Sequence, residues 1–540
     1  MTNPQSVQGA ESLVNSFLSA GVRNFVVSPG SRNGALSLAL ASASNENLVN
    51  LAVRLDERSA AFVALGMALK TKTPAVVVCT SGTAAANLLP ALVEAKYSEV
   101  PLIAITADRP KELINTGASQ TIDQENIFGH VAQLNLTLDS QTQDFVSWAN
   151  YVEDLINEIA KNPQPAHINI HFSEPLIPSE SFKFLKPGNF KLIKNEQIEL
   201  PDDFINKKGL IIAGATFENL DSYVDDLAAN LKWPVVAEPP ILASVNKISH
   251  HPAVLAALPE DLQPEVLLTV GRVGLSRPTA KLLANVKRKI HLNSPKVLDQ
   301  VRAKVVTKQL AKLSTGNQSE AWIAIWNEVN RKAENAASKR KVNQPELLQV
   351  VTNLFLNAAA DSHIHLSASL AARDFELMLT KDLAKAMAAK GITVSMNRGV
   401  NGIDGVVSTA FGLSLAEPER QHYCLLGDIA ALHDLSGFAL PLGERPVNLH
   451  FVIVNNNGGG IFSTLEQASV KNFDRVYATS HGIEIDKVLA QLKVKQVNPG
   501  ARHEIKSAPG VSAQVFNVEP IEKAKETREE FYKLIKQAIN

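Results

Sequence analysis

The sequence predicts an α/β protein in which helices cover parallel β-sheets on both faces. Short runs of β-branched and other apolar residues alternate with longer stretches whose apolar residues recur at helical spacing, as in residues 57–70. Strands that are apolar almost throughout are typical of parallel sheets buried on both faces. A length of 540 residues exceeds one compact domain and suits about three.

Three blocks of this kind follow one another along the chain. Polar stretches at residues 179–203 and 326–346 interrupt the pattern, and the second is predicted to be a solvated helix that leads into a linker. We therefore predict domains at 1–180, 181–345 and 346–540. The apolar runs that we interpret as strands lie within residues 24–30, 75–82, 101–110, 166–172, 209–215, 234–239, 265–272, 289–293, 363–369, 393–399, 421–428 and 447–460.

Charge and composition argue against several classes of protein. The 53 basic and 54 acidic residues leave a formal charge of −1, which gives no reason to expect a nucleic-acid or acidic-membrane partner. The N-terminus lacks the pattern of a secretory signal, and no apolar run has the length of a membrane span, so we expect a cytoplasmic protein. The two cysteines, Cys79 and Cys424, lie in apolar runs and are predicted to be buried thiols.

Polar and Gly-rich motifs follow five of the predicted strands. In open parallel sheets, ligands bind beyond the carboxyl ends of the strands, where such loops converge. The fingerprints of ATP-binding loops and of dinucleotide-binding folds are absent, which argues against a nucleotide-binding oxidoreductase. The motifs that remain are SPGSRN, TSGTA, TADRP, GD and NNNGGG.

Two of these motifs are spaced to form a metal site. Asn456 lies 28 positions after Asp428, which suits neighbouring parallel strands joined by a crossover helix. Magnesium prefers oxygen ligands, and the Asp428 carboxylate, the Asn456 amide and the Gly458 carbonyl would supply them beside a diphosphate. Either motif alone is better explained by a helix cap or a tight turn. Their order and spacing together favour the metal site.

This arrangement resembles the binding signature of thiamine-diphosphate enzymes, in which Gly-Asp-Gly is followed by Asn-Asn, although Ile429 replaces the second glycine here. The wider set of motifs resembles one branch, the 2-succinyl-5-enolpyruvyl-6-hydroxy-3-cyclohexene-1-carboxylate synthases of menaquinone and phylloquinone biosynthesis. The resemblance implies a thiamine-diphosphate-binding fold and Mg²⁺ or Mn²⁺ as the metal. The motifs lie at residues 28–33, 56–68, 80–95, 106–110, 117–124, 397–412, 427–437 and 455–462.

By this resemblance, Glu57 is the catalytic carboxylate that contacts N1′ of the cofactor's aminopyrimidine. A glutamate in the first turn of a helix is also a common structural feature, and the match of residues 56–68 is what favours the catalytic role. In such enzymes the protein mainly positions the cofactor and tunes its charge. The resemblance assigns cofactor binding to Glu57, Gly427, Asp428, Ile429, Asn456, Gly458, Gly459, Ile461 and Phe462.

The substrates implied by the resemblance are 2-oxoglutarate, which loses carbon dioxide, and isochorismate, which accepts the succinyl carbanion in a 1,4-addition. Both are dianions, and arginine binds carboxylates better than lysine does because it can donate two parallel hydrogen bonds. The alternative interpretation is that the arginines in these motifs are solvated residues on the protein surface. Substrate binding is thus expected at Ser31, Arg32, Arg109, Gln120, Arg277, Ser369, Arg373, Arg398, Ile461 and Phe462.

Two other functions compete with this one. Another thiamine-diphosphate enzyme, such as an acetohydroxyacid synthase or a 2-oxo-acid decarboxylase, would share Glu57, Asp428 and Asn456 but need not carry the arginine-bearing loops. A non-catalytic binding protein should have lost one of these three residues, and all are present. In this superfamily the glutamate of one chain faces the diphosphate site of another, so we expect a homodimer or a dimer of dimers.

Overall fold

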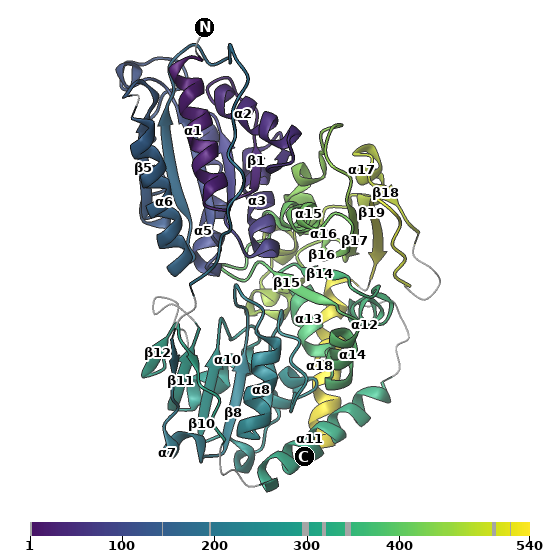
Figure 1. Cartoon of the computed structure of the whole chain (residues 1–540). Coiled ribbons are helices and arrows are strands. Elements are labelled where there is room, and N and C mark those ends of the chain that lie inside the picture. Colours follow the sequence, from purple (N-terminus) through teal and green to yellow (C-terminus); the bar gives the residue numbers. More distant parts are fainter. Residues whose placement is uncertain are drawn as a thin grey trace. The chain divides into compact units, whose positions relative to one another are not determined.

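The chain forms two compact units in the computed structural model, which describes residues 3–142, 144–193, 196–293, 302–315, 320–340, 347–498, 504–518 and 520–540. Each unit is built on parallel sheets covered by helices (Figure 1). The first unit comprises Met1–Lys194, Asp404–Glu419 and His433–Asn448, and the second comprises Asn195–Ile403, Arg420–Leu432 and Leu449–Asn540. The α/β class with parallel sheets is therefore confirmed.

The first unit contains a six-stranded parallel sheet. In spatial order its strands are β2 (Asn50–Val53), β1 (Asn24–Val27), β3 (Ala75–Cys79), β4 (Leu102–Asp108), β6 (Ala166–His171) and β5 (Leu134–Asp139). Its helices are α1 (Gln5–Ser19), α2 (Gly34–Asn45), α3 (Glu57–Thr71), α4 (Thr83–Ala86), α5 (Leu89–Ser98), α6 (Phe145–Lys161) and α15 (Val406–Ala416). Single 3₁₀ turns lie at Lys111–Leu113, Gly129–Val131, Ser140–Thr142 and Leu435–Phe438.

Helices cover both faces of this sheet. One apolar core joins Phe25 and Val27 of β1 to residues of α1, α2 and α6, and α1 and α6 lie side by side over the sheet (Figure 1). Helix α3 packs on β1, β3 and β4 but contributes nothing to that core, so it covers the opposite face. Burial on both faces explains why β1, β3 and β4 are apolar almost throughout.

Glycines allow α3 and α15 to pack closely. A Cβ added at Gly66 of α3 would lie 2.2 Å from the Thr409 carbonyl oxygen, and one at Gly412 of α15 would lie 2.0 Å from the Val63 carbonyl oxygen. Both distances are far below van der Waals contact, so a larger residue at either position would push the helices apart. The helix that begins with Glu57 is therefore held by backbone-to-backbone contact.

The second unit contains two large parallel sheets and one pair of short parallel strands. The five-stranded sheet has the order β12 (Val305–Thr307), β11 (Arg288–Leu292), β10 (Val266–Val270), β8 (Gly209–Ala213) and β9 (Val235–Ala237), and β13 (Leu310–Ala311) pairs with β7 (Gln197–Ile198). Its helices are α7 (Asp202–Ile205), α8 (Asp221–Leu231), α9 (His251–Ala256), α10 (Arg277–Asn285) and α11 (Glu320–Ser338), with a 3₁₀ turn at Glu260–Leu262.

Tryptophans fill the core beside the five-stranded sheet. The Trp322 indole donates a hydrogen bond to the Gly209 carbonyl (3.0 Å), and a Cβ at Gly209 would lie 2.2 Å from the Trp233 ring. Trp326 and Ala333 of α11 are also buried, so the prediction of a solvated helix here is wrong. One face of α11 is apolar and packs, while its charged residues face solvent.

The six-stranded sheet of the second unit has the order β15 (Thr393–Met396), β14 (His363–Leu366), β16 (Gln421–Gly427), β17 (Asn448–Asn455), β19 (Val511–Asn517) and β18 (Lys495–Gln496). Its helices are α12 (Leu347–Asn357), α13 (Leu370–Met378), α14 (Lys381–Ala389), α16 (Asp428–His433), α17 (Ile485–Gln491) and α18 (Ile521–Ile539). Shorter turns lie at Gly460–Thr464, Glu466–Ser469 and Asp474–Ala478.

Segments far apart in the sequence share one core in this unit. Helix α18, at the C-terminal end, runs beside α11 (Figure 1) and buries Phe531 and Ile535 in the core of the five-stranded sheet. The predicted domain boundary at 345/346 lies outside the described residues. All twelve apolar runs predicted as strands contain one, whereas β2, β5, β7, β12, β13, β18 and β19 were not predicted.

Candidate active site

Two neighbouring strands of the six-stranded sheet in the second unit end in the predicted metal motifs. Strand β16 ends at Gly427, and Asp428 begins α16 directly after it. Strand β17, next to β16 in the sheet, ends at Asn455, so Asn456 opens the following loop. The spacing of Asp428 and Asn456 predicted adjacent parallel strands, and the sheet order confirms it. The two loops therefore meet at the carboxyl edge of the sheet.

The Asp428 carboxylate joins these two loops. Its Oδ1 accepts a hydrogen bond from the backbone N–H of Ile429 (2.8 Å), and its Oδ2 accepts one from the N–H of Gly458 (2.8 Å). Nε2 of His481 lies 3.3 Å from the same Oδ2. Only 2% of Asp428 is exposed, and this burial raises the pKa of the carboxyl, while the hydrogen bonds from Gly458, Ile429 and His481 act in the opposite direction.

The Asn-Gly loop has a backbone that few residues could adopt. Asn457 has a φ of 63° and Gly458 a φ of 146°, both in the region that asparagine and glycine tolerate best. The Asn457 side chain accepts a hydrogen bond from the N–H of Gly482 (2.7 Å). A Cβ at Gly460 would lie 2.1 Å from Nδ2 of Asn456. Glycine at 460 thus leaves the space that the Asn456 amide occupies.

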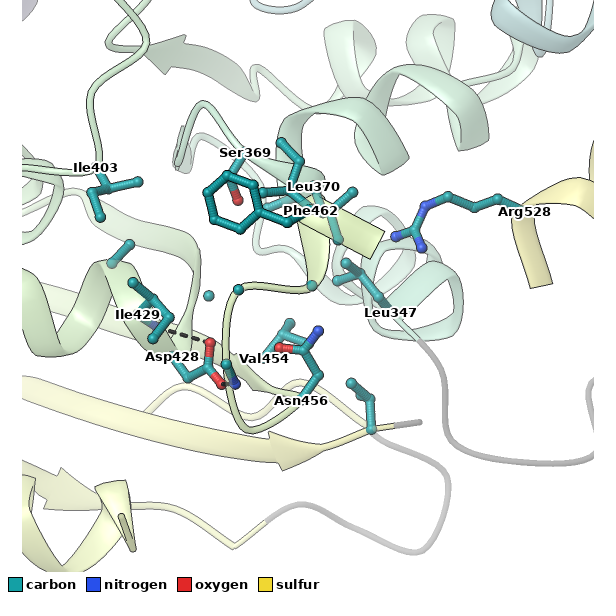
Figure 2. A pocket seen from close by; sticks show the side chains of 18 residues that line it. Leu347, Ser369, Leu370, Ile403, Asp428, Ile429, Val454, Asn456, Phe462 and Arg528 are labelled. Carbon is teal, nitrogen blue, oxygen red and sulfur yellow. Dashed lines mark hydrogen bonds between the residues drawn. The ribbon is translucent and has the colours of Figure 1, made fainter. Parts of the chain in front are cut away.

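A cavity of about 140 Å³ opens beside these loops. A single water needs roughly 10–15 Å³ by the same measure, so the cavity has room for a ligand group of several atoms. Figure 2 shows Asp428 and Asn456 on one side of it and the Phe462 ring with Leu370 on another. The lining includes Ser369, Gly427, Asp428, Ile429, Asn456, Gly458, Gly459, Ile461 and Phe462 from the predicted set.

The residues around the cavity fit a diphosphate with a divalent cation. The chain supplies one carboxylate and neutral oxygens, and no group of three or more His, Cys, Asp or Glu side chains in the described part of the chain could hold a metal ion by itself. A hard cation here would therefore need phosphate oxygens to complete its ligand shell. Asp428, Asn456 and the Gly458 carbonyl are the residues that could hold it.

Sequence reasoning missed two residues at this cavity. Arg528 of α18 lines it, and its guanidinium is hydrogen-bonded to both carboxylate oxygens of Asp374, through Nε at 2.8 Å and through Nη2. His481 contacts Asp428 from a loop 53 positions further along the chain. Neither residue lies in a recognisable motif, so no local signal in the sequence could have identified them.

Glu57 is the first residue of α3 in the first unit, immediately after β2 and its short connection. Asp56 caps the helix by accepting a hydrogen bond from the Ser59 N–H (3.1 Å). Glu57 is half-buried, and most of the helix beyond it is fully buried. Burial and then the charge of Glu57 raise the pKa of the Cys79 thiol, which shows that Glu57 acts electrostatically on the end of β3. Cys79 and Cys424 are both buried, as predicted.

A buried ion pair supports the connection that leads to Glu57. Arg54 is 1% exposed, and its guanidinium pairs with Glu444 while also donating to the Val53 carbonyl (2.7 Å). Glu444 in turn accepts a hydrogen bond from the Val53 N–H (3.2 Å). The end of β2 is thus fixed by a partner nearly four hundred residues away.

The structure brings three of the predicted substrate residues of the first unit together. Arg109 donates from Nη2 to Oε1 of Gln120 (3.4 Å), and Gln120 donates from Nε2 to the Ser81 carbonyl (2.9 Å). Burial and the positive charge of Arg109 lower the pKa of Arg32, and Glu174 opposes this effect. Ser31 is exposed beside Arg32 in the loop after β1. A cluster of positive charge with polar side chains around it suits a carboxylate.

Two further predicted arginines of the second unit share a buried charged cluster. Arg373 donates to the Ala368 and Ser369 carbonyls (3.3 and 3.1 Å), and Arg398 donates to Oδ1 of Asn401 (3.0 Å). Burial lowers the pKa of Arg373, and Glu376 is the largest of the charges that raise it. Arg277 begins α10 and is exposed.

Comparison with known proteins gives one family. Residues 7–127 match a model described as "Thiamine pyrophosphate enzyme, N-terminal TPP binding domain". Proteins named 2-succinyl-5-enolpyruvyl-6-hydroxy-3-cyclohexene-1-carboxylate synthase are similar along most of the chain. That of Rhodococcus erythropolis is 33% identical over 91% of this chain and 92% of its own length, and that of Thermobifida fusca is 34% identical over 89% of each. That of Nocardia farcinica is 31% identical over 92% of this chain and 93% of its own length.

Proposed function

Because the chain belongs to the 2-succinyl-5-enolpyruvyl-6-hydroxy-3-cyclohexene-1-carboxylate synthase family, we propose that it acts on 2-oxoglutarate and isochorismate. 2-Oxoglutarate loses carbon dioxide, and the succinyl unit that remains is added to isochorismate in a 1,4-addition. The protein is a thiamine-diphosphate-dependent transferase of menaquinone or phylloquinone biosynthesis, and we place it in the cytoplasm. No helix in the described ranges has the length and apolar character needed to cross a bilayer.

One observation carries this proposal on the structural side. The Asp428 carboxylate bridges the ends of two adjacent parallel strands beside a cavity that the Asn456 and Gly458 loop also lines. Carboxylate, amide and carbonyl oxygens at one edge of a sheet are the ligands that Mg²⁺ or Mn²⁺ takes together with a diphosphate. In this proposal Gly427, Ile429 and Gly459 line the cofactor site, and Ile461 and Phe462 form an apolar wall beside it.

The remaining roles are assigned to the charged residues at strand ends. Bound thiamine diphosphate supplies the nucleophilic carbon and the electron sink for decarboxylation. Glu57 holds a proton at its carboxylate against N1′ of the aminopyrimidine, and its half-buried position at a helix start leaves that carboxylate accessible. Arginines bind the substrate carboxylates through paired hydrogen bonds, assisted by Ser31, Gln120 and Ser369. These arginines are Arg32, Arg109, Arg277, Arg373 and Arg398.

The direct test is a product assay by mass spectrometry with thiamine diphosphate, Mg²⁺, 2-oxoglutarate and isochorismate. The proposal predicts the succinyl adduct with release of one carbon dioxide. Pyruvate in place of 2-oxoglutarate is the matched control, since an acetohydroxyacid synthase would use it and this enzyme should not. Consumption of 2-oxoglutarate without adduct would show that the acceptor is wrong, and no turnover at all would overturn the assignment.

We also propose that the active site is shared between two copies of the chain, with Glu57 of one copy facing the diphosphate site of the other. Mixing Glu57→Gln with Asp428→Asn under conditions that exchange subunits tests this arrangement. In a homodimer with shared sites, each mixed dimer regains one intact site, and about a quarter of wild-type activity should return. If each chain carries a complete site, no activity returns. Sedimentation would then distinguish a dimer from a dimer of dimers.

The domain division proposed for this chain is 1–180, 181–345 and 346–540. The three parallel sheets support it, because their strands lie within residues 24–171, 209–307 and 363–517. Limited proteolysis followed by mass spectrometry would test it, since cleavage should concentrate near residues 180 and 345.

A further inference from the structure

Several ionisable side chains are buried in the second unit without belonging to the cofactor cavity or to the predicted substrate set, and four of them lie on or beside β9, α9 and α13. Glu238 and His251 are 0% exposed, and Lys247 and Glu376 are 1% exposed. Burying charged groups costs several kcal/mol each unless other charges and hydrogen bonds offset the lost hydration. A cluster of this kind therefore calls for a specific explanation, and its contacts supply one.

Glu238 fixes the loop that leads to Arg277. It follows β9 directly, and its Oε1 accepts hydrogen bonds from the backbone N–H groups of Gly274 (3.1 Å) and Leu275 (2.9 Å). Ser276 and Arg277 come next, and α10 begins there. One carboxylate oxygen thus holds two consecutive peptide groups, which sets the direction in which the chain enters the helix that starts with Arg277.

Glu376 fixes the helix that carries Arg373. The two residues lie three positions apart on α13, so their side chains project from neighbouring positions of one helical face. Oε1 of Glu376 is 2.7 Å from Nε2 of His251, and Nδ1 of the neighbouring His250 is 2.7 Å from the Leu377 carbonyl oxygen. Helix α9 is therefore tied to α13 at two consecutive residues of each.

The guanidinium groups of Arg373 and Arg398 act on the same carboxylates. Burial raises the pKa of Glu376, while a hydrogen bond from Ser276 and then the charges of Arg373, Arg398 and Lys247 oppose that rise. Burial and then Glu376 raise the pKa of Glu238, and Arg398 again opposes the rise. Burial lowers the pKa of His251 well below its usual value, and the charge of Lys247 lowers it further. The two arginines are thus the cations that act on both buried carboxyl groups.

Four polar atoms around these residues are buried without a hydrogen-bond partner in the described part of the chain: Nδ1 of His251, Oε2 of Glu238, Oε2 of Glu376 and Nε of Arg398. The charges of Arg373 and Arg398 offset only part of the hydration that the two carboxyl groups lose. If this group served stability alone, apolar residues of similar size would stabilise the folded state at least as well. The unfavourable burial of these carboxylates is explained if they hold the arginines in position to bind a ligand.

We propose that Glu238 and Glu376 are positioning residues of the substrate pocket, which fix Arg277, Arg373 and Arg398 without touching the substrate themselves. Glu238 acts through the N–H groups of the 274–275 loop, and Glu376 acts through the shared helix and the charge of the two buried arginines. This inference rests on the proposed function, because that function assigns the three arginines to the substrate carboxylates.

The test uses Glu238→Gln and Glu376→Gln, which keep side-chain size and one oxygen acceptor but remove the charge. For each variant, kcat and KM are measured for 2-oxoglutarate and for isochorismate, together with thiamine-diphosphate affinity and thermal unfolding. Removing contacts that bind substrate and transition state equally raises KM and leaves kcat unchanged. We expect KM for at least one substrate to rise about 10-fold or more, with kcat within about 3-fold of wild type.

Glu94→Gln is the matched control, because Glu94 is a 2%-exposed glutamate on α5 of the first unit, outside the proposed site. It should leave both KM values unchanged. Unchanged KM values in both cluster variants would overturn the inference. So would a loss of kcat, cofactor affinity and thermal stability in parallel, because that result indicates a purely structural role. The wild-type assay reports separately on the proposed function, and if the wild type makes no adduct, the function fails and the positioning roles fail with it.

Discussion

The six-stranded sheets of the two units have the same strand order, although the sequence shows no internal repeat. If the strands of each sheet are numbered along the chain, both run 2-1-3-4-6-5, from β2 to β5 in the first unit and from β15 to β18 in the second. The loops that follow equivalent strands nevertheless carry different chemistry. The second strand of the first sheet leads to Glu57, whereas its counterpart leads to Arg398. One topology has thus been used for two kinds of site.

The third and fourth strands show how small the chemical difference is. In the first sheet, Oε1 of Gln124 accepts a hydrogen bond from the Gly82 N–H (3.0 Å) and so joins the loops after β3 and β4. In the second sheet, Asp428 joins the loops after β16 and β17 by accepting from the Gly458 N–H (2.8 Å). A neutral amide and a carboxylate do the same structural task. Only the carboxylate also offers a cation a negative charge.

The largest effect expected from this comparison concerns Glu57 and its counterpart Arg398. Glu57→Gln should lower kcat by about 1,000-fold with little change in KM, because a group that transfers a proton typically contributes 10²–10⁴-fold. Arg398→Met should instead raise KM, since it removes a carboxylate contact. Steady-state kinetics of both variants check this contrast. A large KM effect from Glu57→Gln would show that the two strand ends are not functionally distinct.

The next prediction concerns the two side chains that join neighbouring strand-end loops, Asp428 and Gln124. Asp428→Asn keeps an oxygen that can accept from Gly458 but removes the charge, and cofactor and Mg²⁺ affinity should fall about 100-fold, or roughly 3 kcal/mol. The reciprocal change, Gln124→Glu, should leave both affinities unchanged. Its carboxylate cannot donate to Oδ1 of Asn169 as the amide does (2.9 Å), so thermal stability should fall instead. Titration of thiamine diphosphate with and without a metal chelator measures these affinities.

Stability should depend on a buried ion pair in the first unit. The side chains of Arg54 and Glu444 are 1% and 8% exposed, and Glu444→Gln leaves the Arg54 charge without its counter-ion. Breaking such a pair typically costs about 3–5 kcal/mol. Urea unfolding should show this loss. Glu328→Gln is the control, because Glu328 pairs with Arg331 at the surface, where solvent screens the charges, so its loss should change stability little.

The smallest effect expected is a pH dependence of stability from Asp434. Burial raises the pKa of this carboxyl to about 7, while hydrogen bonds from the Ser408 N–H (2.7 Å) and hydroxyl (3.1 Å) act against the rise. The folded state therefore holds a proton that the unfolded chain, with a pKa of 3.8, gives up. This contribution is complete below pH 4 and is lost as the pH rises through 7.

Thermal unfolding of Asp434→Asn between pH 4 and pH 8 tests this prediction. Asparagine can accept from the Ser408 N–H and donate to its hydroxyl, so it mimics the protonated acid at every pH. The melting temperature of the variant should exceed that of the wild type increasingly as the pH rises. A constant difference across this range would mean that Asp434 titrates as an ordinary carboxyl.

Local patterns in the sequence determined most of the fold and the core of the candidate site. Apolar runs buried on both faces identified the central strands, and the spacing of Asp428 and Asn456 placed their loops on neighbouring strands. These inferences succeed because strand burial and parallel connections impose patterns within a few dozen residues. Strands such as β2 and β18 carry no such pattern, because they are short and partly exposed, and they were missed, as was the longer internal strand β19.

Only the tertiary structure decided which distant side chains meet. The pairing of Arg54 with Glu444, the contact of His481 with Asp428 and the buried group around Glu238 and Glu376 leave no motif. The shared topology of the two six-stranded sheets was equally invisible, because different residues build the same strand order. The physical reason is that burial of a charge depends on its partners in space, and those partners lie anywhere along the chain. Sequence therefore determined the strand-end chemistry, and packing decided what holds it in place.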